Sequence, residues 1–431
     1  MDRRSFLKKS ALGAASMAVP TILPSGRLFA ATGSRRANHV VFCLYAGGVR
    51  NLESVLKNEG NLMPSMLKGN ASISADISGS IDAMPSSPLS KTLQEYGTLF
   101  TNIKFSDGPT GHFNGHTSAI TGQHTNSNLS LRTNPPMPTV FELYRKHNSP
   151  THAARNAWWI SHSNNLYPLL NHSSHPDYGV NYAANQIAPN PFFGWDVSTN
   201  LRHELEFTDQ KAATIKDLQA YMDSNFKKTY SLNSGVVNSA DDRAEMVAWK
   251  TEMQNKRVTG QLNNPWSIPS WMSGDQYNVF FAEELIKKFQ PELTVVNLFD
   301  VDIAHENFSQ YCNALHRADY AVAHLWDTIQ STPGMKDDTV MIVMPEIGRN
   351  QYANSLVDQN GRAALDHTNG DPMARDVFCM VVGPPGVVNQ DSVNTDLGAT
   401  VDVVPTIADI LGFGADLGVN LPGSVLQSAF S

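Results

Sequence analysis

The stretch LTVVNLFDVDIAHENFSQYCNALHRADYAVAHLWDTIQ, residues 293–330, holds the pattern that indicates the fold. Its first part, LTVVNLF, is a short apolar run rich in β-branched residues, which predicts a buried strand. From Asn307 onward, apolar residues recur at the three- and four-residue spacing of a helix. A buried strand followed by a long helix is typical of a parallel sheet, because parallel strands need a crossover between them.

The same alternation of strand and helix recurs along most of the chain. Apolar runs of the strand type are HVVFCLYAGG (39–48), AWWIS (157–161), DTVMIVMPEIG (338–348) and DVFCMVVGPPG (376–386). Helical patterns occupy 88–97, 138–148, 275–290 and 401–412. This order predicts a three-layer α/β/α sandwich over residues 38–426, with a mostly parallel central sheet covered by helices on both faces. Residues 165–275 break the alternation and predict a cap-like insertion over the sheet.

The N-terminal segment has the three parts of an export signal: the basic MDRRSFLKKS, the apolar ALGAASMAVPTIL and the small-residue LFAATGS. The apolar part is too short to span a bilayer. The paired Arg3 and Arg4 point to the twin-arginine export machinery as a partner. We therefore expect residues 1–31 to be a twin-arginine signal peptide, cleaved near Ala30 or Ala31, and the mature protein to be periplasmic or secreted.

Charge and cysteine usage exclude several classes of protein. The formal net charge is −8, and residues 1–31 carry five basic residues and one acidic residue, so cleavage would bring the charge to −12. Such a balance lacks the basic footprint that nucleic acid or an anionic membrane surface requires. No later apolar run is long enough to span a membrane. The three widely spaced cysteines predict buried free thiols and not a disulfide framework.

Carboxylates, imidazoles and one guanidinium follow several of the predicted strands. They are Asp300, Asp302 and His305 after 293–299, Glu346 and Arg349 after 338–345, and the later pair Asp366 and His367. A single residue of this kind more often caps a helix or bonds a loop. Because ligands of such sheets bind at the carboxyl ends of the strands, the whole set predicts a site for a divalent metal that prefers oxygen and nitrogen ligands.

The segment GHFNGHTSAITG, residues 111–122, raises a separate question. In a helix, His112 and His116 would share one face and point toward a ligand, a metal or the core. Three roles stay open for His112: a metal ligand, a general acid/base or phosphate-accepting group, and a relic of a lost site. A neutral imidazole is a good ligand for zinc or manganese, and His112 with Glu346 could provide part of a metal position.

The order of these pieces resembles the alkaline phosphatase and sulfatase superfamily. HFNGHTSAITG has the spacing of its nucleophile segment, where a Thr, Ser or modified Cys stands nine residues before the Thr of a TG pair. MPEIGRN lies where a DHG motif is usual, and VDVVPTIADILGF with the LPGSVL tail is similar to the late helix and its continuation. The resemblance covers most of residues 38–426 and implies an alkaline-phosphatase-like fold.

The sequence also departs from that resemblance. Ala46 or Gly47 stands where the first metal-binding Asp belongs, His112 stands where the nucleophile belongs, and Glu346 with Ile347 replaces an Asp-His pair. What remains is similar to the three-ligand Asp/His/His half of a two-metal centre. The twin-arginine leader, the HF segment, the EIGR turn and the DH pair are together similar to the secreted bacterial domain-of-unknown-function family 1501.

The sequence therefore predicts an exported hydrolase of phosphate or sulfate esters with a degenerate metal centre. Asp302, His305 and His367 would hold one divalent ion, zinc, manganese or calcium, and the substrate would be an anionic small molecule or glycan. His112 would orient the water or leaving group, Glu346 would act as ligand or base, and Arg349 would bind the anion. The alternative is a catalytically inactive sulfatase-like protein with a binding or envelope-assembly role.

Overall fold

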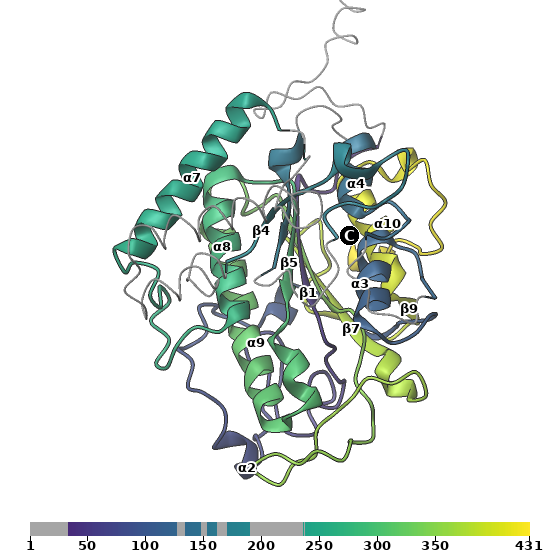
Figure 1. Ribbon diagram of the computed structural model, residues 1–431. Helices are drawn as coiled ribbons and strands as arrows, with labels where there is room; N and C mark the ends of the chain where they lie inside the picture. The colour runs from purple at the N-terminus through teal and green to yellow at the C-terminus, as the bar shows by residue number, and fades with distance from the viewer. Residues whose placement is uncertain (1–32, 127–133, 148–152, 162–169, 190–235, 237) are drawn as a thin grey trace, which may run out of the picture.

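A computed structural model describes residues 33–126, 134–147, 153–161, 170–189, 236 and 238–431 (Figure 1). The predicted signal peptide, residues 1–31, lies outside the described residues, and so do residues 190–235.

The described part of the chain is built on one sheet of nine strands. They are β1 (His39–Tyr45), β2 (Gly97–Lys104), β3 (Ala157–Ile160), β4 (Asn185–Ile187), β5 (Leu293–Leu298), β6 (Thr339–Pro345), β7 (Asp376–Val382), β8 (Ser392–Asn394) and β9 (Gly398–Ala399). Their order is β4-β3-β5-β1-β6-β7-β2-β8, with β9 beside β2. Every pairing is parallel except the two that β7 makes with β6 and β2. The prediction of a mostly parallel sheet is confirmed.

Helices cover both faces of this sheet, as the three-layer prediction requires (Figure 1). One layer contains α7 (Ala240–Val258), α8 (Gly274–Phe289) and α9 (Phe308–Ser331), and the other contains α3 (His112–Thr121), α4 (Val140–His147) and α10 (Val403–Ile410). The shorter elements are α2 (Ala75–Ser78), η1 (Leu93–Tyr96), η2 (Ala153–Asn156), η3 (Gly179–Tyr182), η5 (Asp300–His305), η6 (Pro372–Arg375), η7 (Thr400–Asp402), η8 (Gly414–Asp416) and η9 (Gln427–Ala429).

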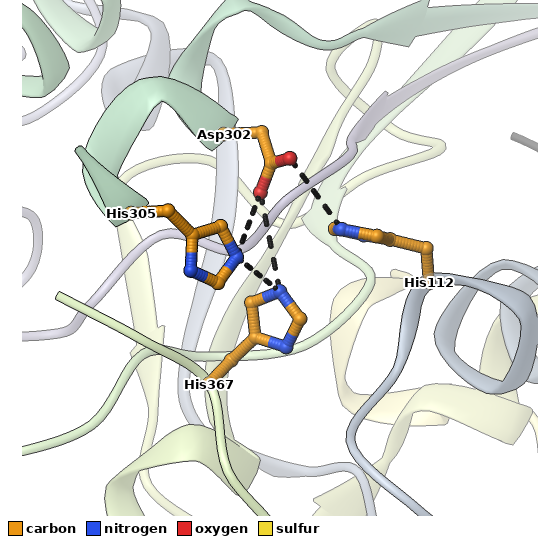
Figure 2. Close-up of side chains that lie close together, drawn as sticks. All are labelled: His112, Asp302, His305 and His367. Carbon is orange, nitrogen blue, oxygen red and sulfur yellow. Dashed lines mark hydrogen bonds and ion pairs between the residues drawn. The ribbon is translucent and has the colours of Figure 1, made fainter. Parts of the chain in front are cut away.

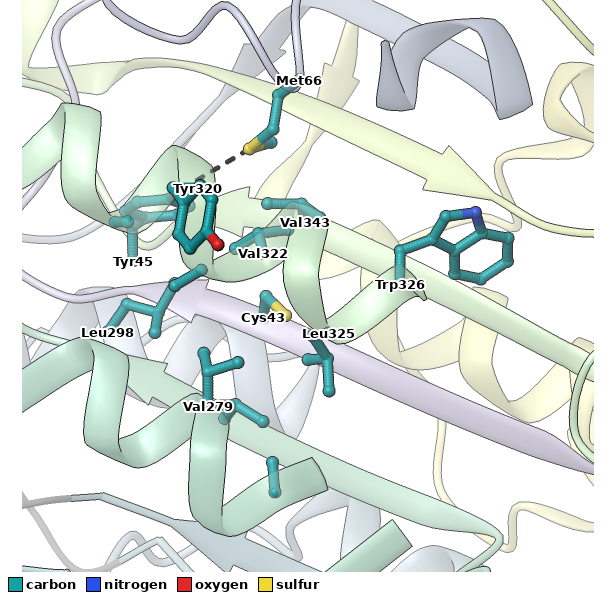
Figure 3. Packing of buried hydrophobic residues seen from close by; sticks show 14 of the residues in the cluster. Cys43, Tyr45, Met66, Val279, Leu298, Tyr320, Val322, Leu325, Trp326 and Val343 are labelled. Carbon is teal, nitrogen blue, oxygen red and sulfur yellow. Dashed lines mark hydrogen bonds between the residues drawn. The ribbon is translucent and has the colours of Figure 1, made fainter. Parts of the chain in front are cut away.

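The core lies on the two faces of the sheet, because successive side chains of a strand point to opposite sides. In β1, Cys43 and Tyr45 join the cluster that faces α8 and α9, and part of it is drawn in Figure 3. Phe42 and Leu44 join the cluster that faces α3, α4 and α10. Both clusters are almost wholly buried, and so are all three cysteines, which are free thiols.

Some elements differ from the sequence prediction. The predicted helix over 88–97 forms only the short 3₁₀ turn η1, followed directly by β2, which we did not predict. Within 165–275, the described residues contribute strand β4, paired with β3, and helix α7, whose Trp249 packs against Trp158 and Phe289. In the part of the chain that the structure describes, no helix is long and apolar enough to cross a membrane.

Candidate metal centre at the carboxyl edge of the sheet

The residues of the candidate site come from segments that follow strands β5, β6 and β2. Strands β5, β1 and β6 run parallel side by side, so the residues after them meet at one edge of the sheet. Asp302 and His305 lie in η5, just after β5, and His367 lies in the long connection after β6. His112 is the first residue of α3 and reaches the same edge (Figure 2).

Four side chains converge here: His112, Asp302, His305 and His367 (Figure 2). One ligand atom from each lies within 4.8 Å of every other, and all four residues are partly buried. His305 Nε2 lies 2.9 Å from His367 Nε2 and 3.5 Å from Asp302 Oδ1. The ligands of a tetrahedral zinc ion are about 3.3 Å apart, given bonds of about 2.0–2.1 Å. His305 Nε2, His367 Nε2 and Asp302 Oδ1, which are 2.9, 3.5 and 3.9 Å apart, therefore have nearly the separation that one metal ion requires.

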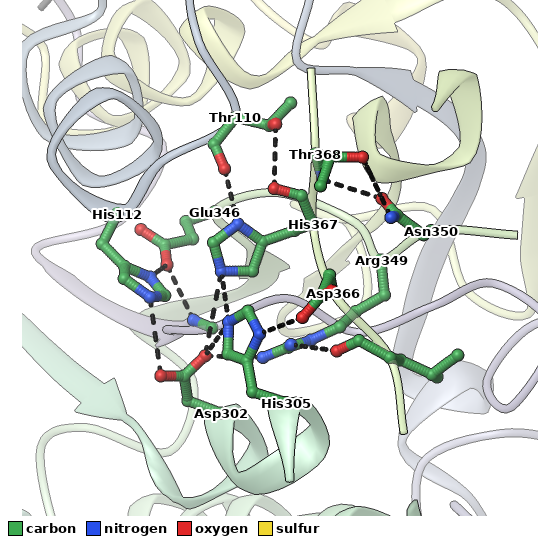
Figure 4. Close-up of polar contacts among 12 residues, drawn as sticks. Thr110, His112, Asp302, His305, Glu346, Arg349, Asn350, Asp366, His367 and Thr368 are labelled. Carbon is green, nitrogen blue, oxygen red and sulfur yellow. Dashed lines mark hydrogen bonds and ion pairs between the residues drawn. The ribbon is translucent and has the colours of Figure 1, made fainter. Parts of the chain in front are cut away.

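The ring nitrogens of His305 and His367 that face away from the cluster each contact an oxygen atom (Figure 4). His305 Nδ1 lies 2.7 Å from Asp366 Oδ1, and His367 Nδ1 lies 2.6 Å from the carbonyl oxygen of Thr110. Since a carboxylate and a carbonyl can only accept, both Nδ1 atoms carry a hydrogen, and in the neutral rings both Nε2 atoms present lone pairs to the cluster. This arrangement is typical of metal-binding histidines, whose second nitrogen is fixed by an acceptor.

The short contact between the two Nε2 atoms also fits a cation. Two lone pairs 2.9 Å apart repel unless a proton or a metal ion lies between or beside them. Burial, together with the positive charges of His112 and Arg349, lowers the pKa of His367 to about 3. A proton on the His367 ring is therefore disfavoured at neutral pH, and the donor set of imidazole nitrogens and a carboxylate suits zinc or manganese.

Asp302 is the carboxylate of the cluster, and Asp300 is not. Asp300 faces away, with its Oδ2 accepting from the backbone N–H of Asp275 at 3.0 Å. Asp302 Oδ1 accepts from Arg349 Nη2 at 2.6 Å, and Oδ2 lies 3.5 Å from His112 Nε2. Burial opposes ionisation of Asp302, but His112 and Arg349 outweigh it and hold the pKa of Asp302 well below its usual range. The carboxylate is thus available to a metal as an anion.

Arg349, which we predicted to bind an anionic substrate, is wholly buried. Its Nη1 donates to the carbonyl oxygen of Leu365 at 2.7 Å, and its Nη2 donates to Asp302. The guanidinium thereby connects η5 to the segment that leads to His367 (Figure 4). Contact between Arg349 and a substrate stays a prediction.

Glu346, predicted as a ligand or base, is also wholly buried and lies behind His112. Its Oε1 accepts from Gly47 N at 2.7 Å and lies 2.8 Å from His112 Nδ1. Burial disfavours its charged form, but His116 and His112 outweigh this and lower the pKa of Glu346 to about 2. Likewise, burial disfavours protonated His112, yet Glu346 and Asp302 raise the pKa of His112 to about 9. The predicted roles of Glu346 as ligand or base stay predictions.

The structure adds contacts that the sequence did not reveal. His305 contacts Asp366, and His367 contacts Thr110. Both contacts depend on the conformation of loops, and the sequence of these loops has no periodicity that predicts it. The place of Gly47 beside Asp302 could have been suspected from the Gly pair that ends the first predicted strand. At Gly47 the backbone φ is +95°, and a β-carbon there would lie 2.5 Å from the Asp302 β-carbon.

The chain matches no protein-family model and no curated protein. Among solved structures, it is similar to wild type alkaline phosphatase PafA (10% identity, 93% of this chain and 100% of that chain, TM-score 0.48). It is also similar to the lipoteichoic acid synthase LtaP from Listeria monocytogenes (11%, 96% and 80%, 0.42) and to PsFucS1 sulfatase from Pseudoalteromonas sp. (10%, 91% and 71%, 0.46). At these identities and TM-scores, no likeness assigns an activity to this chain.

Proposed function

We propose that this chain is an exported hydrolase of phosphate or sulfate esters that uses one divalent metal ion held by Asp302, His305 and His367. The observation that carries the proposal is the convergence of two imidazole Nε2 lone pairs and a carboxylate oxygen, with each imidazole fixed from behind by an acceptor. Three protein ligands leave a coordination position open, which is the feature that separates catalytic from structural metal sites.

A bound ion would polarise the ester and lower the pKa of a water molecule. The residues around it have separate tasks. Arg349 and Asp302 are locked together, so the carboxylate keeps one orientation. His112 faces the three ligands with Nε2 and is backed by Glu346, which suits it to hold or donate a proton at the leaving oxygen. Because its pKa is raised, His112 would serve as the acid in this step.

Membership and location are part of the proposal. The order of motifs along residues 38–426 supports a distant place in the alkaline phosphatase and sulfatase superfamily, near the domain-of-unknown-function family 1501. The N-terminal pattern supports export by the twin-arginine route, with an anionic small molecule or glycan as the substrate. Replacing Arg3 and Arg4 by Lys should leave uncleaved protein in the cytoplasm, because the arginine pair is the recognised element. Equal periplasmic yield from the double variant would contradict the route.

The metal test separates an enzyme from an inactive relative. Purified mature protein should contain close to one equivalent of zinc, manganese or calcium by elemental analysis. His367→Ala should lose most of it, because removal of one of three ligands leaves a weakly held ion. His147→Ala is the control, since His147 lies on α4 and contacts Tyr178, outside the cluster.

Hydrolysis of p-nitrophenyl phosphate or p-nitrophenyl sulfate should depend on the same ion and fall in His112→Ala. Folded protein that holds no metal and cleaves neither ester would refute the hydrolase proposal and leave the binding or assembly role. Metal without turnover would indicate a site that recognises an anion without cleaving it.

A further inference from the structure

His116 lies one helical turn after His112 and is wholly buried behind the candidate metal centre. It does not belong to the four-residue cluster. Its Nε2 lies 3.0 Å from Asn297 Oδ1, in strand β5. Its Nδ1 contacts Glu346 Oε2 and also lies 3.0 Å from the backbone carbonyl oxygen of His112. Both ring nitrogens therefore face oxygen atoms of the protein.

Glu346 depends on His116 for one of its two oxygens. Oε1 is shared by Gly47 N and His112 Nδ1, at 2.7 and 2.8 Å. Among the described residues, the ion-pair contact on Oε2 is the one with His116. A buried carboxylate needs donors on both oxygens, because its desolvation is costly. His116 thereby prevents rotation of the carboxylate that orients His112.

The packing of α3 agrees with this reading. A β-carbon at position 115 would lie 2.9 Å from Glu346 Oε2 and 3.0 Å from Ile347 Cγ2. Gly115 therefore allows the N-terminal end of α3, which carries His112 and His116, to lie directly against the carboxylate. The two histidines contact different oxygens of Glu346, one from each side of Gly115 in the sequence.

We propose that His116 is a positioning residue: through Glu346 it holds the His112 ring with Nε2 directed at Asp302. The catalytic consequence rests on the proposed function, in which His112 acts on the ester. The positioning itself is a property of the metal-free protein and can be measured there.

Three substitutions separate the contacts that His116 makes. The amide nitrogen of Asn occupies the place of His Nδ1, so His116→Asn keeps a donor for Glu346 Oε2. The amide nitrogen of Gln occupies the place of His Nε2, so His116→Gln keeps the contact with Asn297 and loses that with Glu346. His116→Phe keeps the ring volume and loses the contacts with Glu346 and Asn297, together with the contact with the His112 carbonyl oxygen.

The first measurement is the ¹⁵N spectrum of histidine-labelled, metal-free protein, with the His112 signals assigned by their absence from His112→Ala. Above the raised pKa of about 9, where the His112 ring is neutral, we expect one form, with the hydrogen on Nδ1, in the wild type and in His116→Asn. We expect a mixture of forms in His116→Gln and His116→Phe. If His116→Asn matched His116→Gln, or if all variants kept the wild-type form, positioning through Glu346 would be overturned.

The second measurement is hydrolysis of p-nitrophenyl phosphate or sulfate. In His116→Gln and His116→Phe, kcat should fall about 10- to 100-fold, the usual effect of losing an outer-shell partner. KM and metal content should stay unchanged, and His116→Asn should retain most of the activity. A fall in kcat that follows thermal stability instead of the Glu346 contact would indicate a structural role only. If the wild type hydrolyses neither ester, the proposed function fails, while the spectra still decide the positioning.

Discussion

His112 lies between two carboxylates, and this position makes the metal-free protein sensitive to pH. Glu346 and Asp302 raise its pKa from 6.5 to about 9 against the opposing effect of burial. A raised folded-state pKa adds stability that is complete below pH 6.5 and is lost as pH rises through about 9. In chelator, the free energy of unfolding should therefore fall between these values by about 1–3 kcal/mol more in wild type than in His112→Asn. Urea denaturation at both pH values measures this fall. An equal fall in wild type and in His112→Asn would contradict the assignment.

Asp366 has no place in the metal cluster, yet its carboxylate fixes the ring of His305. Asp366→Ala removes the acceptor from His305 Nδ1 and should weaken metal binding about 10- to 100-fold. Asp366→Asn keeps an oxygen for the same contact and should weaken metal binding less than Asp366→Ala does. Competition with a chromogenic chelator measures both affinities. Asp396→Ala, in the exposed turn between β8 and β9, serves as the control and should match the wild type.

At the scale of elements, the turn after β1 sets how closely η5 approaches the sheet. Gly47 has φ +95° and faces the Asp302 side chain, whereas Gly361 has φ +78° and open space around it. Alanine at either position incurs backbone strain of about 1–2 kcal/mol. Gly47→Ala should destabilise the protein more than Gly361→Ala does and should lose metal, because its β-carbon would displace Asp302. Equal losses of stability in Gly47→Ala and Gly361→Ala, with metal retained in both, would show that η5 can move aside.

Elements with strong periodicity were predictable, and those with weak periodicity were not. Helix α9 and strands β1, β5 and β6 could be identified because most of their residues are apolar and buried. Strand β2 was missed because Thr101 and Asn102 interrupt its apolar run at a bulge. The reversed direction of β7 could not be foreseen either. The connection from β6 returns from the same edge of the sheet, and such a return carries no sequence signal.

For the whole molecule, the sequence predicted which residues gather at the carboxyl edge but not what each one contacts. Parallel strands bring their ends together by topology, which was sufficient to bring Asp302, His305 and His367 into one set. Whether Asp300 or Asp302 faces the cluster depends on the turns of η5, and the reciprocal bonds between Asp300 and Asp275 decide it. Those bonds join residues that are 25 positions apart, beyond the reach of any local pattern.

The same topology predicts that a metal ion would stabilise the entire domain. Asp302 and His305 follow β5, whereas His367 follows β6 on the far side of β1, so the proposed ligands meet only in the folded chain. An ion that binds the folded state alone raises the free energy of unfolding by about 4 kcal/mol at a thousandfold excess over its Kd. Adding zinc or manganese to chelator-treated protein should therefore raise the melting temperature, measured by calorimetry, of wild type and of His147→Ala. His367→Ala should show little or no rise, because the ion would lose one of its three ligands. An equal rise in melting temperature in all three proteins would place the binding outside this cluster. If a protein that holds a full equivalent of the ion showed no rise, the unfolded chain would bind the ion as well as the folded chain does.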